Sequence, residues 1–535
     1  MDESKTNVGY AHAERLDNHE ALMRRIDRGV RVTFLLSVLA MPVSYLAQIV
    51  LARGSQDAVG IYGGILLWAG FVQSFFYLGG NAVLIKFLPE ISPDRRFPFL
   101  ISYSGMILGF TLLGVLLFTL VPYLSNTVLG HAMGNFLFAL LLVIALVNIY
   151  QQIILSSLKA CLELVKAQIL TRVTTIGYLL AFSTFLIFAK PWFLKHLLIL
   201  IAAVHIVVVL VPLLLGMYFL KRNLRPDWGS LRWHLPRGFW RFTLMTQISS
   251  VVNFFSSRFD QILVLIYASI SGLGIYFVMA QLAAAIQLIS GFFLESMLPA
   301  LINILAQAGR DAARSAYYRG ARLNQVIVTS TALMLLCFHS VILSTFGAQY
   351  PAHWQVLVVL VLFSGINSLG TLNAYLLTGT GKVDLVVICQ ALQVGTFVVL
   401  FQILGGKNSL LSLALAQGLA MTVGVLATVV ATTRGLGMGL RVPREFWASL
   451  ATLLGATAAL LLTRGLSILE CLLLFLASQT TFLVLAGYHW PEIRSILSLF
   501  RLRDMGQRSE QYENRIFIGD PIPPSVVPKI RGQEQ

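Results

Sequence analysis

The chain has 535 residues, of which 57% are hydrophobic and only 12% are charged, and its mean hydropathy is +0.79. Soluble domains carry about 25% charged residues, so this composition excludes an ordinary soluble protein and indicates a membrane protein. The net charge of +16 would suit a nucleic-acid partner, unless membrane topology explains it.

Apolar stretches of about 20 residues recur from near residue 30 to near residue 488, and each can cross a bilayer as a helix. We therefore predict an all-α polytopic membrane protein with about fourteen transmembrane helices. The expected ranges are 30–51, 62–86, 98–122, 133–157, 167–189, 195–220, 239–268, 272–300, 325–346, 354–378, 384–405, 409–432, 446–463 and 467–488.

The loops that connect these spans differ in their number of basic residues. With both termini in the cytoplasm, thirty-three of the 39 Lys and Arg fall on the cytoplasmic side, five fall outside, and Arg258 lies within the membrane. This asymmetry is the positive-inside pattern of membrane proteins. Topology therefore accounts for the basic charge, and no nucleic-acid partner is expected.

The two halves of the chain resemble each other weakly. "RGVRVTFLL" at residue 28 corresponds to "RGFWRFTLM" at residue 237, "VGIYG" (59–63) to "LGIYF" (273–277), and "FLPEI" (87–91) to "MLPAL" (297–301). Six helices fit within this period, and an even number returns the chain to the same side of the membrane. Parallel repeats of this kind place a substrate site at their interface.

The repeat predicts a division of the chain into segments. The expected segments are a cytoplasmic N-terminal segment (1–29), an N-lobe of helices 1–6 (30–222), a basic cytoplasmic linker (223–238), a C-lobe of helices 7–12 (239–433), two additional helices (434–489) and a cytoplasmic tail (490–535).

The helix expected at 239–268 carries polar side chains in its apolar run. Thr246, Ser250, Asn253, Ser257 and Asp260 fall on one face at helical spacing. Hydroxyl groups in membrane helices often bond back to their own helix or pack against neighbours. Five polar residues in register, with a guanidinium beside them, favour the wall of a polar cavity instead.

Charged groups inside the membrane cost at least about 2.5 kcal/mol on insertion scales, so they mark functional candidates. Arg258 is the main candidate, because a guanidinium holds phosphate through two parallel hydrogen bonds. Asp260 and Glu295 are candidates for binding a coupling proton or cation. For Asp260, neutralisation of a basic neighbour on another helix is an equally good interpretation.

Other helices carry weaker polar faces, for each of which packing between helices is an equal alternative. Because the first and second helices of each half are equivalent in the repeat, their polar residues are expected to face one shared cavity. The candidates on these helices and on the span 354–378 are Gln48, Gln73, Asn81, Gln281 and Asn367.

No catalytic or metal-binding pattern accompanies these residues. The sequence has no HExxH motif, no Walker A motif and no CxxC pair, and its loops are short. We expect a protein that is not an enzyme and that uses no cofactor and no metal.

Three segments resemble polysaccharide transporters, the Wzx-like oligosaccharide-lipid flippases of the MATE-like superfamily. They are a first helix pair ending in "KFLPE" (45–91), "SSRFDQILVLIYASISGLGIYFVMAQLAAAI" (256–286), and a region ending in "LLTGTGK" (346–382). Together the likeness covers roughly residues 30–435. It implies a MATE-like fold of two six-helix lobes, here with two extra C-terminal helices.

The resemblance also implies a function and a location. A flippase of this family carries a polyprenyl-pyrophosphate-linked oligosaccharide from the cytoplasmic to the outer leaflet of the bacterial inner membrane by alternating access, during O-antigen, capsule or exopolysaccharide synthesis. Its expected partners are that lipid-linked oligosaccharide, membrane lipids, and polysaccharide polymerase and chain-length proteins.

Alternative functions stay open at this point. Lipid II flippases also have fourteen helices, but they carry several arginines deep in the first lobe, where this chain has only Arg53 near an outer end. An ion-coupled MATE-type exporter of drugs or metabolites would need an acidic cavity, and the first two helices supply no carboxylate. A non-transporting subunit of a polysaccharide-assembly complex and a membrane glycosyltransferase or polymerase subunit are further alternatives.

Overall fold

The structure is a computed structural model that describes residues 36, 39–120, 135–161, 163–188, 190–224, 235–307, 309–404, 409–437, 442–463 and 467–488. Apart from one short 3-10 turn, η2 (Pro351–His353), every regular element in these ranges is an α-helix. The predicted N-terminal segment 1–29 and the tail 490–535 lie outside the described residues.

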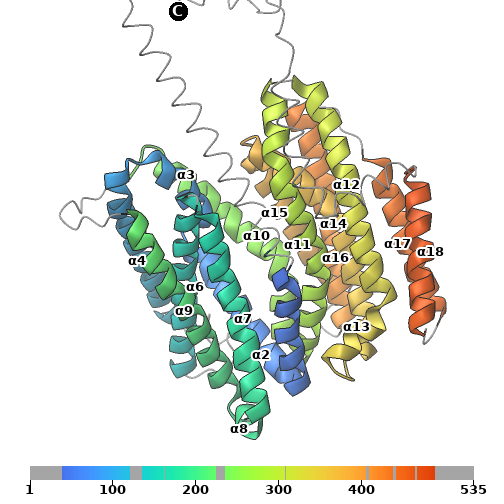
Figure 1. The fold of residues 1–535 in the computed structure, drawn as a ribbon, viewed down its shortest axis with the longest axis horizontal. Helices are drawn as coiled ribbons and strands as arrows, with labels where there is room; N and C mark the ends of the chain where they lie inside the picture. The colour runs from blue at the N-terminus through green and yellow to red at the C-terminus, as the bar shows by residue number, and fades with distance from the viewer. Residues whose placement is uncertain are drawn as a thin grey trace, which may run out of the picture.

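The helices form two bundles that lie side by side (Figure 1). The first bundle contains the helix Leu39–Gly54, α2 (Gln56–Phe76), α3 (Gly80–Glu90), α4 (Pro93–Leu120), α6 (Asn135–Ala160), α7 (Leu164–Phe188), α8 (Lys190–Lys195) and α9 (Leu197–Leu224). The second contains α10 (Phe239–Tyr267), α11 (Ile270–Gln307), α12 (Gly309–Cys337), α13 (His339–Phe346), α14 (Trp354–Gly379), α15 (Val383–Ile403) and α16 (Leu410–Leu436). At its outer edge stand α17 (Arg444–Leu462) and α18 (Ile468–Leu485).

The helical content confirms the predicted class of polytopic all-α membrane protein. Within the described ranges, 12 helices are long and apolar enough to cross a membrane. The helix Leu39–Gly54 is apolar but shorter, and α10 is 29 residues long but is not among the 12 because polar and charged side chains interrupt its apolar run. With these two, a helix of the structure overlaps each of the fourteen predicted ranges.

The prediction of 62–86 as a single helix is wrong, because the helix is interrupted between α2 and α3. Gly79 has φ of 81° and Leu78 has φ of 39°, both in the left-handed region that ends a right-handed helix. The hydroxyl of Tyr103 donates to the carbonyls of Tyr77 and Leu78 at this break, each at 3.1 Å. The predicted span 325–346 is likewise divided, into α12 and α13.

The repeated Gly-Ile-Tyr motif marks a place where the two bundles meet closely. A Cβ atom on Gly60 of α2 would lie 2.0 Å from the carbonyl oxygen of Ile270, and one on Gly274 of α11 would lie 2.4 Å from that of Gln56. Only glycine allows helices to approach this closely. Each copy of the motif therefore packs against the other, as related halves would.

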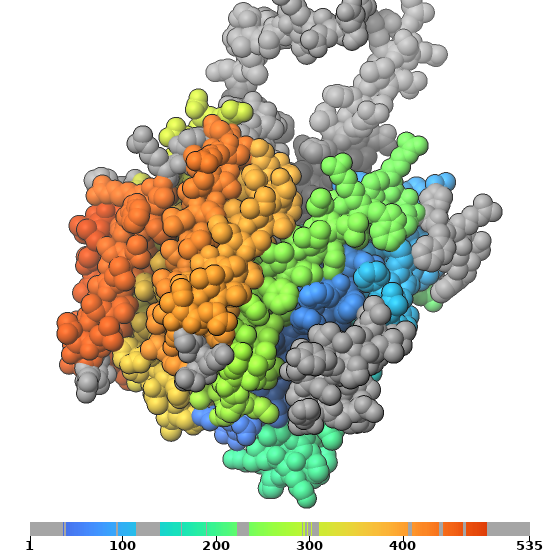
Figure 2. Space-filling view, turned by 180° about the vertical axis from the view of Figure 1, so that it is seen from behind, coloured from blue at the N-terminus to red at the C-terminus, as the bar shows by residue number. Residues whose placement is uncertain are grey.

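α10 lies at the junction of the two bundles. Figure 2 shows it in green on the molecular surface, between the blue helices of the first bundle and the orange helices of the second. Its Phe254 packs edge-on against Phe71 of α2 at 5.9 Å between ring centroids. Its Phe259 packs against Phe397 of α15 at 5.5 Å. α10 is thus in contact with both bundles.

Candidate functional site

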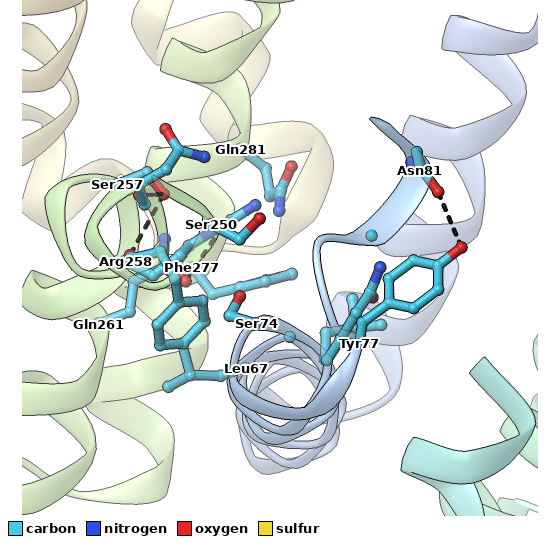
Figure 3. A pocket seen from close by; sticks show the side chains of 16 residues that line it. Leu67, Ser74, Tyr77, Asn81, Ser250, Ser257, Arg258, Gln261, Phe277 and Gln281 are labelled. Carbon is cyan, nitrogen blue, oxygen red and sulfur yellow. Dashed lines mark hydrogen bonds between the residues drawn. The ribbon is translucent and has the colours of Figure 1, made fainter. Parts of the chain in front are cut away.

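A cavity of about 340 Å³ lies between the two bundles. The first bundle contributes α2, the break after it and the start of α3, and the second contributes α10 and α11. Figure 3 shows these two groups of side chains facing each other. The lining residues are Leu66, Leu67, Gly70, Gln73, Ser74, Tyr77, Gly80, Asn81, Ser250, Asn253, Phe254, Ser257, Arg258, Gln261, Phe277 and Gln281.

The hydroxyl groups of α10 in this cavity bond back to their own helix. Ser250 donates to the carbonyl of Thr246 at 2.9 Å, and Ser257 donates to that of Asn253 at 2.8 Å. Such bonds satisfy the hydroxyl hydrogens while the oxygen lone pairs still accept. The hydroxyl oxygens of these serines therefore keep lone pairs that can accept hydrogen bonds in the cavity.

Arg258 is half-buried and gives the inter-bundle cavity its charge. Among the described side chains that line this cavity, only Arg258 is charged at neutral pH, because no carboxylate lines the cavity. Its Nη1 donates to Oε1 of Gln261 on the next helical turn at 3.2 Å, a neutral partner. The guanidinium therefore keeps its charge uncompensated by these neighbours and is suited to an anion.

Asp260 is buried, with 4% of its surface exposed. Tyr276 of α11 donates its phenolic hydrogen to Oδ2 at 2.7 Å. The other carboxylate oxygen, Oδ1, is buried and has no hydrogen-bond partner in the described part of the chain. An unpartnered buried carboxylate oxygen has one coordination position left for a proton, a cation or a ligand hydroxyl.

A second cavity, of about 640 Å³, lies within the second bundle on the other side of α10. α10, α11, α14, α15 and α16 line it, and Ser250, Asn253, Ser257, Arg258 and Gln261 border both cavities. Its further polar residues are Ser249, Ser256, Asp260, Gln287, Ser364, Asn367, Thr371, Tyr375, Thr378, Gln390, Gln393, Gln417 and Thr428. Asp260 is its only carboxylate among the described side chains.

Three glutamines form hydrogen bonds that hold α10 to the rest of the second bundle. The sequence did not predict them. Gln393 of α15 and Gln417 of α16 both donate to the carbonyl of Ser256, at 3.0 and 2.8 Å. Gln390 of α15 donates to Oδ1 of Asn253 at 3.0 Å. A carboxamide in an otherwise apolar helix is the signal that could have identified them, since such groups seldom face lipid.

The sequence of the chain decides its family. The model of the family described as polysaccharide biosynthesis protein matches residues 26–305, more than half of the chain. The chain belongs to the polysaccharide biosynthesis protein family. No curated protein sequence matches it.

Solved structures resemble this polysaccharide biosynthesis protein in fold. The lipid II flippase MurJ, in an inward closed conformation, has a TM-score of 0.64 at 13% identity, over 86% of this chain and 99% of that chain. An inward-facing multidrug resistance MATE family transporter has a TM-score of 0.59 at 12% identity, over 75% and 98%. A transporter of the MOP superfamily from Pyrococcus furiosus has 0.56 at 13% identity, over 78% and 96%. These likenesses establish the predicted MATE-like two-lobe fold of a multi-pass membrane protein.

Most predicted site residues of this polysaccharide biosynthesis protein lie around the two cavities. Those that line the inter-bundle cavity are Arg258, Asn253, Ser257, Ser250, Gln73, Asn81 and Gln281. Asp260 and Asn367 line the second cavity, together with Ser364, Thr371 and Thr378 of the same face of α14. The sequence did not predict that α10 lies between two cavities.

Two predicted residues, Thr246 and Gln48, line neither cavity, and the side chain of a third, Glu295, lies outside the described structure. Thr246 lines neither, because its side chain packs against the α2–α3 break, where a Cβ on Gly79 would lie 2.4 Å from its Oγ1. Gln48 also lines neither, although its Oε1 is buried without a partner among the described residues. Glu295 lies in α11, but its side chain is outside the described part of the structure.

Proposed function

We propose that this protein is a flippase that moves a polyprenyl-pyrophosphate-linked oligosaccharide from the cytoplasmic to the outer leaflet during the synthesis of O-antigen, capsule or exopolysaccharide. The observation that carries the proposal is the inter-bundle cavity, in which Arg258 is the one group of clear charge and the other polar residues are amides, hydroxyls and a tyrosine. A pyrophosphate needs a cation, and sugars need neutral donors and acceptors.

Arg258 supplies the cation for the pyrophosphate. Its N–H groups fit two phosphate oxygens at once, and the contact is stronger in a cavity of low dielectric constant than in water. Gln73 and Gln281, on opposite walls, make no side-chain hydrogen bond in the described structure, so their amides are available to sugar hydroxyls. Alternating access follows from a site that lies between two bundles able to rock about it.

Coupling to an ion gradient is a further part of the proposal. Asp260 has one unpartnered oxygen, and Tyr276 holds the other, so the carboxylate is placed to bind a proton or a cation. Glu295 is the second candidate from the sequence. The alternative, that Asp260 neutralises a basic neighbour on another helix, finds no support among the described ion pairs, which do not include Asp260. Arg258, whose charge interacts with that of Asp260, belongs to the same helix.

The proposed setting is the bacterial inner membrane with both termini in the cytoplasm, as the positive-inside pattern favours. The proposed partners are the lipid-linked oligosaccharide, membrane lipids, and the polymerase and chain-length proteins that receive the product. We propose no enzymatic activity, since transport needs none. A MATE-type exporter of cationic compounds is disfavoured because the described lining of the inter-bundle cavity has no carboxylate.

Lipid II is the second candidate substrate, and the likeness to MurJ, over 86% of this chain, favours it. Arg53, the first-bundle arginine that the sequence singles out, donates to the carbonyl of Thr345 at 2.8 Å and lines neither cavity. Among the described residues, the first bundle therefore brings no arginine into the inter-bundle cavity. Rescue of cells depleted of their lipid II flippase would decide for this candidate.

The test is complementation of a strain that lacks its own copy, with Arg258→Ala and Arg258→Lys at matched protein levels. Arg241→Ala is the control, because Arg241 is exposed on the same helix and lines neither cavity. We expect Ala to abolish surface polymer while the lipid-linked intermediate accumulates, Lys to restore export in part, and the control to export normally. Normal export by both Arg258 variants would refute the assigned site.

A further inference from the structure

The second cavity is strongly polar and nearly uncharged. Among the described side chains that line it, the two acidic or basic residues are Arg258 and Asp260, whose charges are opposite. The remaining polar groups are hydroxyls and carboxamides, and a carboxamide both donates and accepts. The seven carboxamides are Asn253, Gln261, Gln287, Asn367, Gln390, Gln393 and Gln417.

Several of these groups lack partners within the described structure. The side-chain amides of Gln287 and Asn367 make no hydrogen bond there. Oε1 of Gln390 and Oδ1 of Asp260 are buried and unpartnered. Most buried polar groups in proteins are hydrogen-bonded, so unpaired donors and acceptors that converge on one cavity indicate a ligand with many small polar groups.

The charges restrict what this ligand can carry. A pyrophosphate diester already has more negative charge than one guanidinium neutralises, and Arg258 borders both cavities. A carboxylate on the sugars would then find no cation of its own among the described lining residues and would meet Asp260. Burial of an unpaired charge is strongly unfavourable, whereas a hydroxyl or acetamido group matches a carboxamide.

We infer that the second cavity is the compartment for the distal sugars of the glycan, beyond the sugar next to the pyrophosphate that Gln73 and Gln281 contact, and that the glycan is uncharged and rich in hydroxyl and acetamido groups. The inference rests on the proposed function. Arg258 holds the pyrophosphate at the boundary, and the sugars extend past α10 toward Gln287 and Asn367. The volume of about 640 Å³ lies within the range of ~300–1,000 Å³ that is usual for ligand sites.

The test measures binding of three lipids to the full-length protein in nanodiscs. All three have the same polyprenyl pyrophosphate; one carries no sugar, one a disaccharide of N-acetylhexosamines, and one the same disaccharide with a hexuronic acid in place of the terminal sugar. We expect the neutral disaccharide to lower Kd about tenfold relative to the bare lipid. The hexuronic acid should remove most of this gain.

Variants locate the sugars. Asn367→Leu and Gln287→Leu should each raise Kd for the neutral glycolipid about three- to tenfold and leave Kd for the bare lipid unchanged. Gln402→Leu is the control, because Gln402 is exposed on α15 and lines neither cavity. Asn367→Lys supplies a cation and should tighten binding of the hexuronic lipid about tenfold, a gain that misfolding cannot produce.

The outcomes separate this inference from the proposed function. If the bare lipid does not bind, the proposed function fails and the inference fails with it. If the bare lipid binds but the hexuronic lipid binds as tightly as the neutral one, or the Leu variants bind the neutral glycolipid like the unmodified protein, the inference is overturned and the proposed function stands.

Discussion

The backbone N–H of Gly79 donates to Oε1 of Gln247 at 2.8 Å, although the two residues are 168 positions apart and belong to different bundles. The amide nitrogen of the same side chain donates to the carbonyls of Ser74 and Phe75, at 2.5 and 2.7 Å. One glutamine of α10 therefore satisfies the backbone groups that the break between α2 and α3 leaves without helical partners. It joins the two bundles beside the inter-bundle cavity.

Gln247→Leu should destabilise the protein by about 1–3 kcal/mol, because it leaves part-buried backbone groups unpaired. Gln247→Glu keeps an acceptor for the N–H of Gly79 but loses both donors to the carbonyls of Ser74 and Phe75. We expect it to destabilise the protein at least as much as Gln247→Leu does, because its carboxylate then faces these two carbonyl oxygens. Thermal melting of the purified protein measures both. If the Leu variant melts at the same temperature as the unmodified protein, the hydrogen bonds of Gln247 add nothing to stability.

The close approach of α2 and α11 should tolerate no side chain. Gly60→Ala and Gly274→Ala place a Cβ at 2.0 and 2.4 Å from backbone oxygens, so the helices must separate at a cost of about 1–3 kcal/mol or more. Gly395→Ala and Gly455→Ala are matched controls in α15 and α17, where a Cβ meets nothing within 4 Å.

We expect lower melting temperatures and lower export for the first pair only, since alanine at the open positions gains helix propensity. Equal behaviour of all four variants in a melting experiment would contradict the glycine crossing.

Tyr276→Phe should impair function more than Tyr62→Phe, although the two tyrosines occupy the same place in the repeated motif. Tyr276 donates to Asp260 at 2.7 Å, and its loss leaves both carboxylate oxygens unpaired at a cost of about 1.5–3 kcal/mol. Tyr62 packs by its ring, 5.5 Å from that of Phe182, and makes no side-chain hydrogen bond in the described structure. Export and melting temperature measure the difference, which disappears if Tyr276 has no polar role.

Reporter fusions test the proposed topology. Alkaline phosphatase fused after Lys195, on the predicted outer side, should be active, whereas a fusion after Arg310 should be inactive. Fluorescent protein fused after residue 535 should fluoresce, as it does when folded in the cytoplasm. The opposite pattern would invert the orientation and with it the proposed direction of transport.

The amino-acid sequence determined the class of the protein and the position of its helices. Apolar length fixes where a chain can cross a bilayer, and every predicted range overlaps an observed helix because this requirement is local. The polar side of α10 was also predictable, since Ser250, Asn253 and Ser257 recur at helical spacing. The Gly-Ile-Tyr repeat correctly indicated related halves.

Only the tertiary structure decided which of these polar groups share a space. The direction in which a helix face points depends on its neighbours, so the sequence could not show that Thr246 packs against Gly79 while Arg258 borders two cavities. The break after Phe76 was missed because it depends on Tyr103 and Gln247, which are distant in the chain. The glutamines of α15 and α16 acquire their role only where the folded bundle brings them to α10, because hydrogen bonds between helices are set by packing and not by local sequence.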